Sequence, residues 1–275
     1  MVIDRWSPQF RALYGGEFPV DYCCIDTETT GSNPDHDLIL EFGWCLVHDR
    51  EVASQGNLVL NWTGHAVVPE AWLRGQLERI ANVMTEQGKP WRLTPSVLKR
   101  EGVEPTEGLE LILSFLDGVR EAGTLLVAHN GYAFDQKMLA ANFAAFLGVE
   151  GYRFGENGCI DTGAIEKAGQ SERADLLPTD EDTLESYFRR VTSARLKGVR
   201  WALDAHCVPK YGLDRHYGID TSLCHTAGYD AYVCHLLMET FRAQLGRTPA
   251  PAPSAVTPPW QEEATVPRMR RQRVR

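Results

Sequence analysis

The stretch YCCIDTETTG, residues 22–31, decides how this chain begins to fold. Its first part, Tyr22 to Thr27, predicts a buried strand, and the residues Thr30 to Pro34 predict the turn that follows. Side chains alternate across a strand that rises about 3.3 Å per residue, so Asp26 and Glu28 share one face about 6.6 Å apart. Two carboxylates at a strand end suit Mg²⁺ or Mn²⁺, although a solvated strand end is the simpler interpretation of this pair alone.

The segments beyond this turn predict an α/β fold. Two more predicted strands, Leu38 to Val47 and Gly56 to Trp62, would form an antiparallel meander with the first. Apolar runs at 124–128 and 159–161 predict further strands, and apolar residues at helical spacing predict the helices. The predicted helices are 69–87, 107–119, 135–147, 183–191, 202–211 and 228–245. A meander followed by alternating strands and helices favours a mixed sheet, antiparallel and parallel, flanked by helices.

The composition places the chain among globular proteins. Its 275 residues are 43% hydrophobic and 24% charged, which excludes wholesale disorder. No run reaches the roughly 18 apolar residues that a membrane helix needs, so we expect no membrane association. The first ten residues lack the apolar core of a secretory signal, and we therefore expect a cytoplasmic protein. Seven cysteines without a Cys-x-x-Cys pair predict buried reduced thiols rather than disulfides or a zinc site.

Composition also divides the chain into three parts. We expect an N-terminal extension over residues 1–19, a folded domain over 20–245, and a disordered proline-rich tail over 246–275. Six arginines against two glutamates give the tail a net charge of +4, so the total of −9 leaves −13 for the rest. The basic end of the tail would suit nucleic acid or a protein partner, and a solvated terminus with no specific role is the simpler alternative.

Two further stretches place a carboxylate at the start of a predicted helix. In AHNGYAFD, residues 128–135, Asp135 shares the inward face of the apolar residues after it, where a buried carboxylate needs a partner. In HTAGYDAYV, residues 225–233, Asp230 begins another apolar stripe, and we expect His225 in the loop before it. A metal ion would pair with both aspartates. The competing interpretations are an N-cap for Asp135 and an ordinary surface or core histidine for His225.

Taken together and in this order, the three stretches resemble the exonuclease motifs of the DEDDh (DnaQ-like) family of 3′-5′ exonucleases, within the ribonuclease H-like superfamily. The resemblance covers about residues 20 to 245 and includes the supporting stretches Ile39 to Gly43 and Ile160 to Thr162. It implies a ribonuclease H-like fold and an exonuclease domain over 20–245. The catalytic residues that it implies are Asp26, Glu28, Asp135, His225 and Asp230.

This resemblance implies a two-metal phosphodiesterase. Asp26, Glu28, Asp135 and Asp230 would gather four negative charges in one pocket, and two Mg²⁺ or Mn²⁺ ions would relieve their repulsion. His225 has a pKa near ~6.5 when unperturbed, so it suits the role of general base toward a metal-bound water. We expect hydrolysis from the 3′ end of nucleic acid, with single-stranded DNA favoured, and release of nucleoside 5′-monophosphates.

The substrate contacts are predicted from the resemblance and from one basic run. Thr29, Asn130 and Phe134 would line the terminal nucleotide, with His129 on the same side. Arg195 and Lys197 belong to a run without acidic residues, which would follow a phosphate backbone or form a solvated basic face.

Two departures from the family pattern stand out. Glu101-Gly102 stands where relatives often have His-Gly, which affects one expected substrate contact. The segment 64–91, with Trp72 and Trp91, looks longer than usual and is interpreted as an added helix.

Three alternatives remain open from the sequence. An exoribonuclease that trims RNA 3′ ends would use the same site chemistry, because nothing in the sequence shows what surrounds the 2′-hydroxyl. A catalytically inert nucleic-acid-binding module would keep the fold, but all five catalytic positions are filled here. A cysteine nucleophile at Cys224 beside His225 is disfavoured, because sequence neighbours seldom form such a pair. Relatives often dimerise, so a homodimer is a further expectation.

Overall fold

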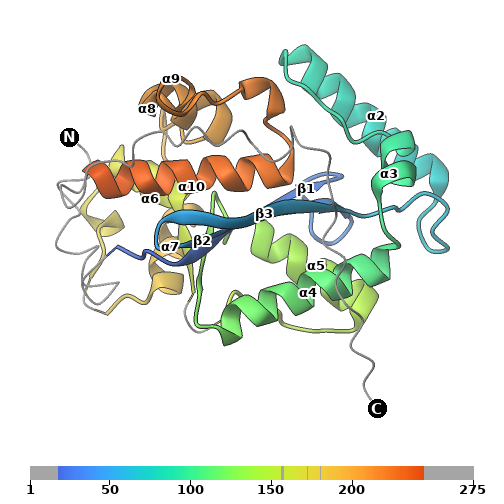
Figure 1. Ribbon diagram of the computed structural model, residues 1–275, viewed down its shortest axis with the longest axis horizontal. Helices are drawn as coiled ribbons and strands as arrows, with labels where there is room; N and C mark the ends of the chain where they lie inside the picture. The colour runs from blue at the N-terminus through green and yellow to red at the C-terminus, as the bar shows by residue number, and fades with distance from the viewer. Residues whose placement is uncertain (1–17, 156–157, 172, 180, 245–275) are drawn as a thin grey trace.

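A computed structural model describes residues 18–155, 158–171, 173–179 and 181–244. Most of the predicted N-terminal extension and the whole predicted tail therefore lie outside the described residues. The described chain is built on one five-stranded sheet with the order β3-β2-β1-β4-β5 (Figure 1). The strands are β1 (Tyr22–Thr29), β2 (Ile39–His48), β3 (Glu51–Val59), β4 (Leu125–Ala128) and β5 (Cys159–Asp161).

The sheet has mixed direction, as the sequence predicts. β1 pairs antiparallel with β2, so that Cys24 stands opposite Cys45, and β2 pairs antiparallel with β3. On its other edge β1 pairs in parallel with β4, with Tyr22 opposite Leu125, and β4 pairs in parallel with β5. The predicted α/β fold with an antiparallel meander and parallel strands is confirmed.

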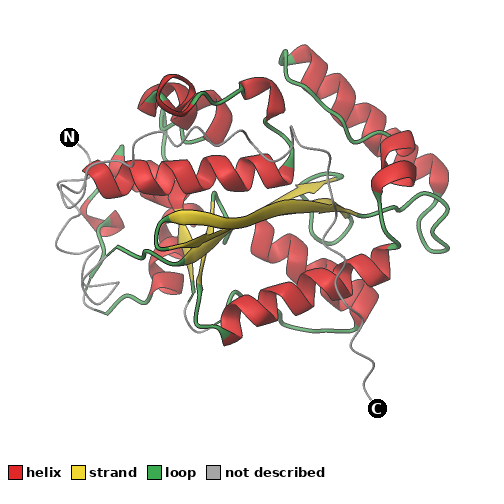
Figure 2. Ribbon diagram, viewed as in Figure 1, coloured by secondary structure: helices red, strands yellow, loops and turns green. Residues whose placement is uncertain are grey.

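Helices cover both faces of the sheet (Figure 2). The longest, α10 (Ala227–Gln244), packs across β1 and β2 on one face, whereas α4 (Pro105–Glu121) and α5 (Asp135–Leu147) lie on the other (Figure 1). The remaining helices are α2 (Glu70–Glu86), α3 (Pro95–Glu101), α6 (Thr162–Gly169), α7 (Leu184–Ser193), α8 (Val208–Tyr211) and α9 (Leu213–Tyr217). The described part of the chain also contains three short helical turns: η2 (Ala174–Leu176), the π-helical η3 (Leu203–Cys207) and η4 (Thr221–Leu223). Within the described ranges, none of these helices combines the length and apolarity that crossing a membrane requires.

The third strand corrects a prediction. The apolar run 56–62 predicted a strand there, but β3 begins at Glu51, directly after a tight turn in which Asp49 and Arg50 have positive φ. β3 is an edge strand with a largely exposed, polar sequence, so its first half carries no apolar signal. The predicted helix 202–211 is likewise divided, because its first part is the π-helical η3.

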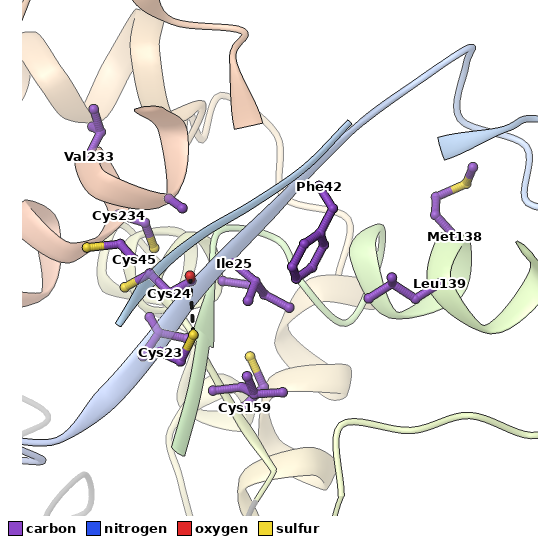
Figure 3. Packing of buried hydrophobic residues seen from close by; sticks show 14 of the residues in the cluster. Cys23, Cys24, Ile25, Phe42, Cys45, Met138, Leu139, Cys159, Val233 and Cys234 are labelled. Atoms are coloured by element: carbon purple, nitrogen blue, oxygen red, sulfur yellow. Dashed lines mark hydrogen bonds between the residues drawn. The ribbon is translucent and has the colours of Figure 1, made fainter. Parts of the chain in front are cut away.

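The core shows which way the β1 side chains point. All seven cysteines are free and buried, as the sequence predicts. Cys24 lies beside Cys45 and Cys234 on the α10 side of the sheet, whereas Ile25 lies with Phe42 toward α5 (Figure 3). Even-numbered β1 residues therefore face α10 and odd-numbered ones face α5.

Candidate active site

The carboxyl end of β1 carries the first two carboxylates. Asp26 and Glu28 continue the even-numbered face of β1 toward α10, and both are half-buried. β4 pairs with β1 only as far as Cys24, so the last residues of β1 extend past it. The start of α5 lies in the space beside them, where Thr27 contacts Asp135.

Asp135 enters this space as the first residue of α5. Its side chain is only 1% exposed, and its Oδ1 accepts a hydrogen bond from Thr27 Oγ1 at 2.7 Å. The loop before it is held by Asp161, whose Oδ1 accepts the backbone N–H groups of Asn130 and Ala164, each at 2.9 Å. Asn130 has a left-handed backbone with φ of 72°, a strained conformation that this support maintains.

Asp230 is placed by the close packing of α10 on the sheet. A Cβ at Gly43 would lie 2.0 Å from the carbonyl carbon of Ala227, so only glycine lets α10 begin this close to β2. The Ala227 N–H donates to the buried Glu41 at 3.1 Å. One turn along, Asp230 is 8% exposed, and its Oδ2 accepts the His225 N–H at 2.9 Å.

The four carboxylates perturb one another. Burial raises the pKa of Asp26 well above its usual value, and the charges of Asp135, Asp230 and Glu28 raise it further. The pKa of Glu28 is raised by burial and then by Asp230. Burial raises the pKa of Asp135 to about 7, and also raises that of Asp230 to about 7 against the opposing effect of His225. Acids from three separate elements therefore share one region of low dielectric.

This region has the donors that a hard divalent ion requires. One potential ligand atom each from Glu28, His225 and Asp230 lies within 4.8 Å of the others. The buried Oδ1 of Asp230 makes no hydrogen bond to the described residues, which leaves its lone pairs for a ligand. Carboxylate oxygens in this density suit Mg²⁺ or Mn²⁺, so the residues present fit the predicted metal centre.

His225 lies between this cluster and a further carboxylate. It precedes α10 in the loop, with a left-handed backbone at φ of 66°. Its ring is 18% exposed, and Nε2 lies 3.3 Å from Oδ2 of Asp204 in η3. A positive φ at a non-glycine residue costs energy, and such strain commonly accompanies a functional position.

The predicted substrate contacts Thr29, His129, Asn130 and Phe134 differ from one another in burial and hydrogen bonding. Thr29 is 8% exposed and donates from Oγ1 to the carbonyl of Gly31, whereas Asn130 and Phe134 are half-buried in the loop that leads to Asp135. His129 has both ring nitrogens engaged: Nδ1 lies 3.0 Å from Thr162 Oγ1, and Nε2 lies 2.6 Å from the Trp201 carbonyl. Burial lowers the pKa of His129 to about 4, so this ring is neutral and bridges the loop to Trp201.

The predicted basic contacts share a cavity with Trp201. Arg195 and Lys197 are exposed and line an open cavity of about 480 Å³. The full lining is Lys167, Ala194, Arg195, Leu196, Lys197 and Trp201. Through the His129–Trp201 contact, this cavity adjoins the loop that leads to Asp135.

Sequence reasoning assigned no role to two charged residues beside the site. Glu41 is fully buried, accepts hydrogen bonds from Asn57 and Ala227, and forms an ion pair with Arg92. Arg92 also contacts Glu101 at 3.0 Å, so the residue that stands where relatives often have histidine belongs to this chain of charges. Glu41 lies in one of the stretches that carry the family resemblance, but its partner Arg92 has no local sequence signal.

Comparisons with known proteins identify the fold. No protein-family model and no curated protein matches this chain. Among solved structures, the zinc-bound E. coli ExoI–ssDNA complex matches with a TM-score of 0.54 at 15% identity, covering 82% of this chain and 41% of that one. E. coli exonuclease I with a dA16 oligonucleotide gives 0.53 at 16% identity, covering 82% and 41%. An ExoI/SSB-Ct complex gives 0.51 at 16% identity, covering 82% and 42%. The chain thus spans about two fifths of the length of these structures and shares their fold, which confirms the predicted architecture.

Proposed function

We propose that this protein is a divalent-metal-dependent 3′-5′ exonuclease that removes nucleoside 5′-monophosphates from the 3′ end of single-stranded DNA. The observation that carries this proposal is the convergence of Asp26, Glu28, Asp135 and Asp230 from three elements into one buried region, with His225 beside them. A cluster of carboxylates without bound cations destabilises the folded state, and such a cost in stability is typical of functional sites.

The residues divide the chemistry between them. Asp26, Glu28, Asp135 and Asp230 would hold two Mg²⁺ or Mn²⁺ ions, which when bound acidify a water and stabilise charge on the phosphate oxygens. Thr27 orients Asp135 through its hydrogen bond, and the His225 N–H orients Asp230. A ring nitrogen of His225 would accept the proton of the attacking water.

The cavity lined by Trp201, Arg195 and Lys197 supports a path for the strand. Arg195 and Lys197 present cations to phosphates, and the half-buried Trp201 offers a ring on which a base can stack, worth about 1–3 kcal/mol per base. The structures that share this fold include exonuclease I with bound single-stranded oligonucleotides, which favours single-stranded DNA as the substrate.

The direct test is digestion of a labelled single-stranded oligonucleotide with Mg²⁺ and with EDTA. Asp230→Ala should abolish nucleotide release, and His225→Ala should slow it by about 10²- to 10⁴-fold. Asp214→Ala removes an exposed carboxylate from α9 and should leave the rate unchanged. Full activity of the Asp230 variant, or no release by the parent protein with Mg²⁺, would overturn the proposal.

The choice of substrate has its own test. Matched DNA and RNA strands compared side by side separate DNA degradation from trimming of RNA 3′ ends. The double variant Arg195→Ala/Lys197→Ala should lower the slope of log affinity against log salt by about 1.4, because each single-strand phosphate contact contributes about 0.7. Lys99→Ala/Arg215→Ala, which removes two exposed cations elsewhere, should keep the parent slope.

Other features stay predictions. A helix does form at Glu70–Glu86, inside the segment 64–91 interpreted as an addition to the family fold. The homodimer, the cytoplasmic location and a binding role for the tail are likewise expectations from the sequence.

A further inference from the structure

Two charged side chains, Lys89 and Asp204, connect the proposed general base His225 to residues outside the acidic cluster. Lys89 Nζ lies 2.6 Å from Oδ2 of Asp204, and the same oxygen lies 3.3 Å from Nε2 of His225. All three side chains are largely buried, with exposures of 26%, 17% and 18% respectively. His225 Nε2 is itself shielded from solvent and makes no well-aligned hydrogen bond within the described residues.

Asp204 stands on an element that the fold holds firmly. It is the second residue of the π-helical η3, and a π-turn of this kind often marks a functional position. The turn is anchored at Glu166 of α6, which is 2% exposed. His206 Nε2 lies 3.0 Å from Glu166 Oε1, Tyr211 donates to Oε2 at 2.5 Å, and Lys210 pairs with the same carboxylate.

Lys89 comes from the segment that follows α2, and α2 together with this segment contacts the site at three points. Arg79 donates to the carbonyl of Thr30, at the end of the first motif, at 2.8 Å. Arg92 pairs with Glu41 beneath the start of α10, and Lys89 pairs with Asp204. The segment after α2 therefore supplies cations to Glu41 and Asp204. These two carboxylates contact Ala227 and His225, which lie just before Asp230.

We propose that Asp204 is a positioning residue for His225, and that Lys89 holds Asp204 in place and neutralises its charge. This inference rests on the proposed function and names two further members of that site. When Asp204 accepts a hydrogen bond from Nε2–H, the proton stays on Nε2, and the neutral imidazole keeps its lone pair on Nδ1 and a defined ring orientation. Lys89 prevents Asp204 from adding a further uncompensated charge beside the four carboxylates.

The alternative role for the pair is purely structural, as an ion pair that ties the segment after α2 to η3. The two roles differ in how their effects combine with loss of His225. A positioning effect passes through the imidazole and vanishes when the imidazole is absent, whereas a structural effect persists.

The experiment is a double-mutant cycle on the full chain with a single-stranded DNA substrate and Mg²⁺. Asp204→Asn should lower kcat by about 10- to 100-fold with little change in KM. In the His225→Ala background the same change should alter kcat by less than about twofold. Lys89→Met should also lower kcat, Lys89→Arg should restore most of it, and neither should add to the loss caused by Asp204→Asn.

A second readout does not depend on activity. Spectra of protein labelled with ¹⁵N-histidine, assigned with the His225→Ala variant, should show the Nε2–H tautomer of His225 in the parent. The spectra should show a mixture of tautomers in Asp204→Asn. Asp182→Asn breaks a comparable pair, between Asp182 just before α7 and Arg190 within that helix, and should change neither kcat nor this signal.

The outcomes separate this inference from the proposed function. An Asp204→Asn loss that persists in full without His225, or an unchanged tautomer signal, would overturn the positioning role while leaving the exonuclease intact. An inactive parent protein, or a fully active His225→Ala variant, would instead overturn the function on which the inference rests.

Discussion

Neutralising one carboxylate of the cluster should stabilise the metal-free protein while it destroys the site. The perturbation is Asp230→Asn, which keeps an oxygen to accept the His225 N–H. In the folded protein the pKa of Asp230 is raised from 3.8 to about 7, chiefly by burial. The folded state therefore binds more protons than the unfolded chain between these values, and the free energy of unfolding falls as pH rises through this window.

The size of the effect follows from that window. Each unit of pKa difference corresponds to about 1.4 kcal/mol, so the ionised Asp230 costs up to about 4 kcal/mol at pH 8. Because the neighbouring carboxyl groups titrate together with Asp230, part of this cost belongs to them. We therefore expect Asp230→Asn to raise the free energy of unfolding by about 2 to 4 kcal/mol in EDTA at pH 8. At pH 4 the gain should be close to zero.

Urea unfolding at both pH values, with EDTA or with Mg²⁺, measures these differences. Mg²⁺ at about 100 times its Kd should stabilise the parent by about 2.7 kcal/mol and the variant far less. Asp182→Asn is the matched control of opposite sign, because a hydrogen bond from Arg190 lowers the pKa of Asp182 to about 2 and its removal should destabilise at pH 8. If Asp230→Asn proved as destabilising as this control in EDTA, the ionised Asp230 would carry no cost in the folded protein and the metal-site argument would fail.

Two further perturbations test how the site is held. In Gly43→Ala the new methyl group would clash with the backbone at the start of α10, so this variant should lose both stability and activity. Gly118→Ala, in an open helical position, should instead stabilise the protein by up to about 1 kcal/mol. Thermal unfolding of the two variants measures this difference in stability. Arg92→Met leaves the buried Glu41 without its cation and should cost about 3–5 kcal/mol in urea unfolding, against less than about 1 kcal/mol for Arg74→Met, which breaks an exposed pair.

The parts of this protein that were predictable are those with a local cause. Strand alternation alone puts Asp26 and Glu28 on one face, and the apolar stripes of two helices mark Asp135 and Asp230 as inward-facing. Helical periodicity also predicted the α5 bounds, and the order of strands and helices predicted the mixed sheet. The first half of β3 was not predicted, because an edge strand is exposed on one side and needs no apolar pattern.

What only the tertiary structure decided is which charges meet. Lys89 and Asp204 are far apart in the chain, as are Glu41 and Arg92, and each pair is joined only when α2, η3 and the sheet pack together. The strength of such an ion pair depends on the distance between the charges and on their burial, and neither quantity produces a pattern in the sequence. The sequence therefore predicted the acidic residues of the site, whereas the cations that pair with the carboxylates around them could be identified only from the folded chain.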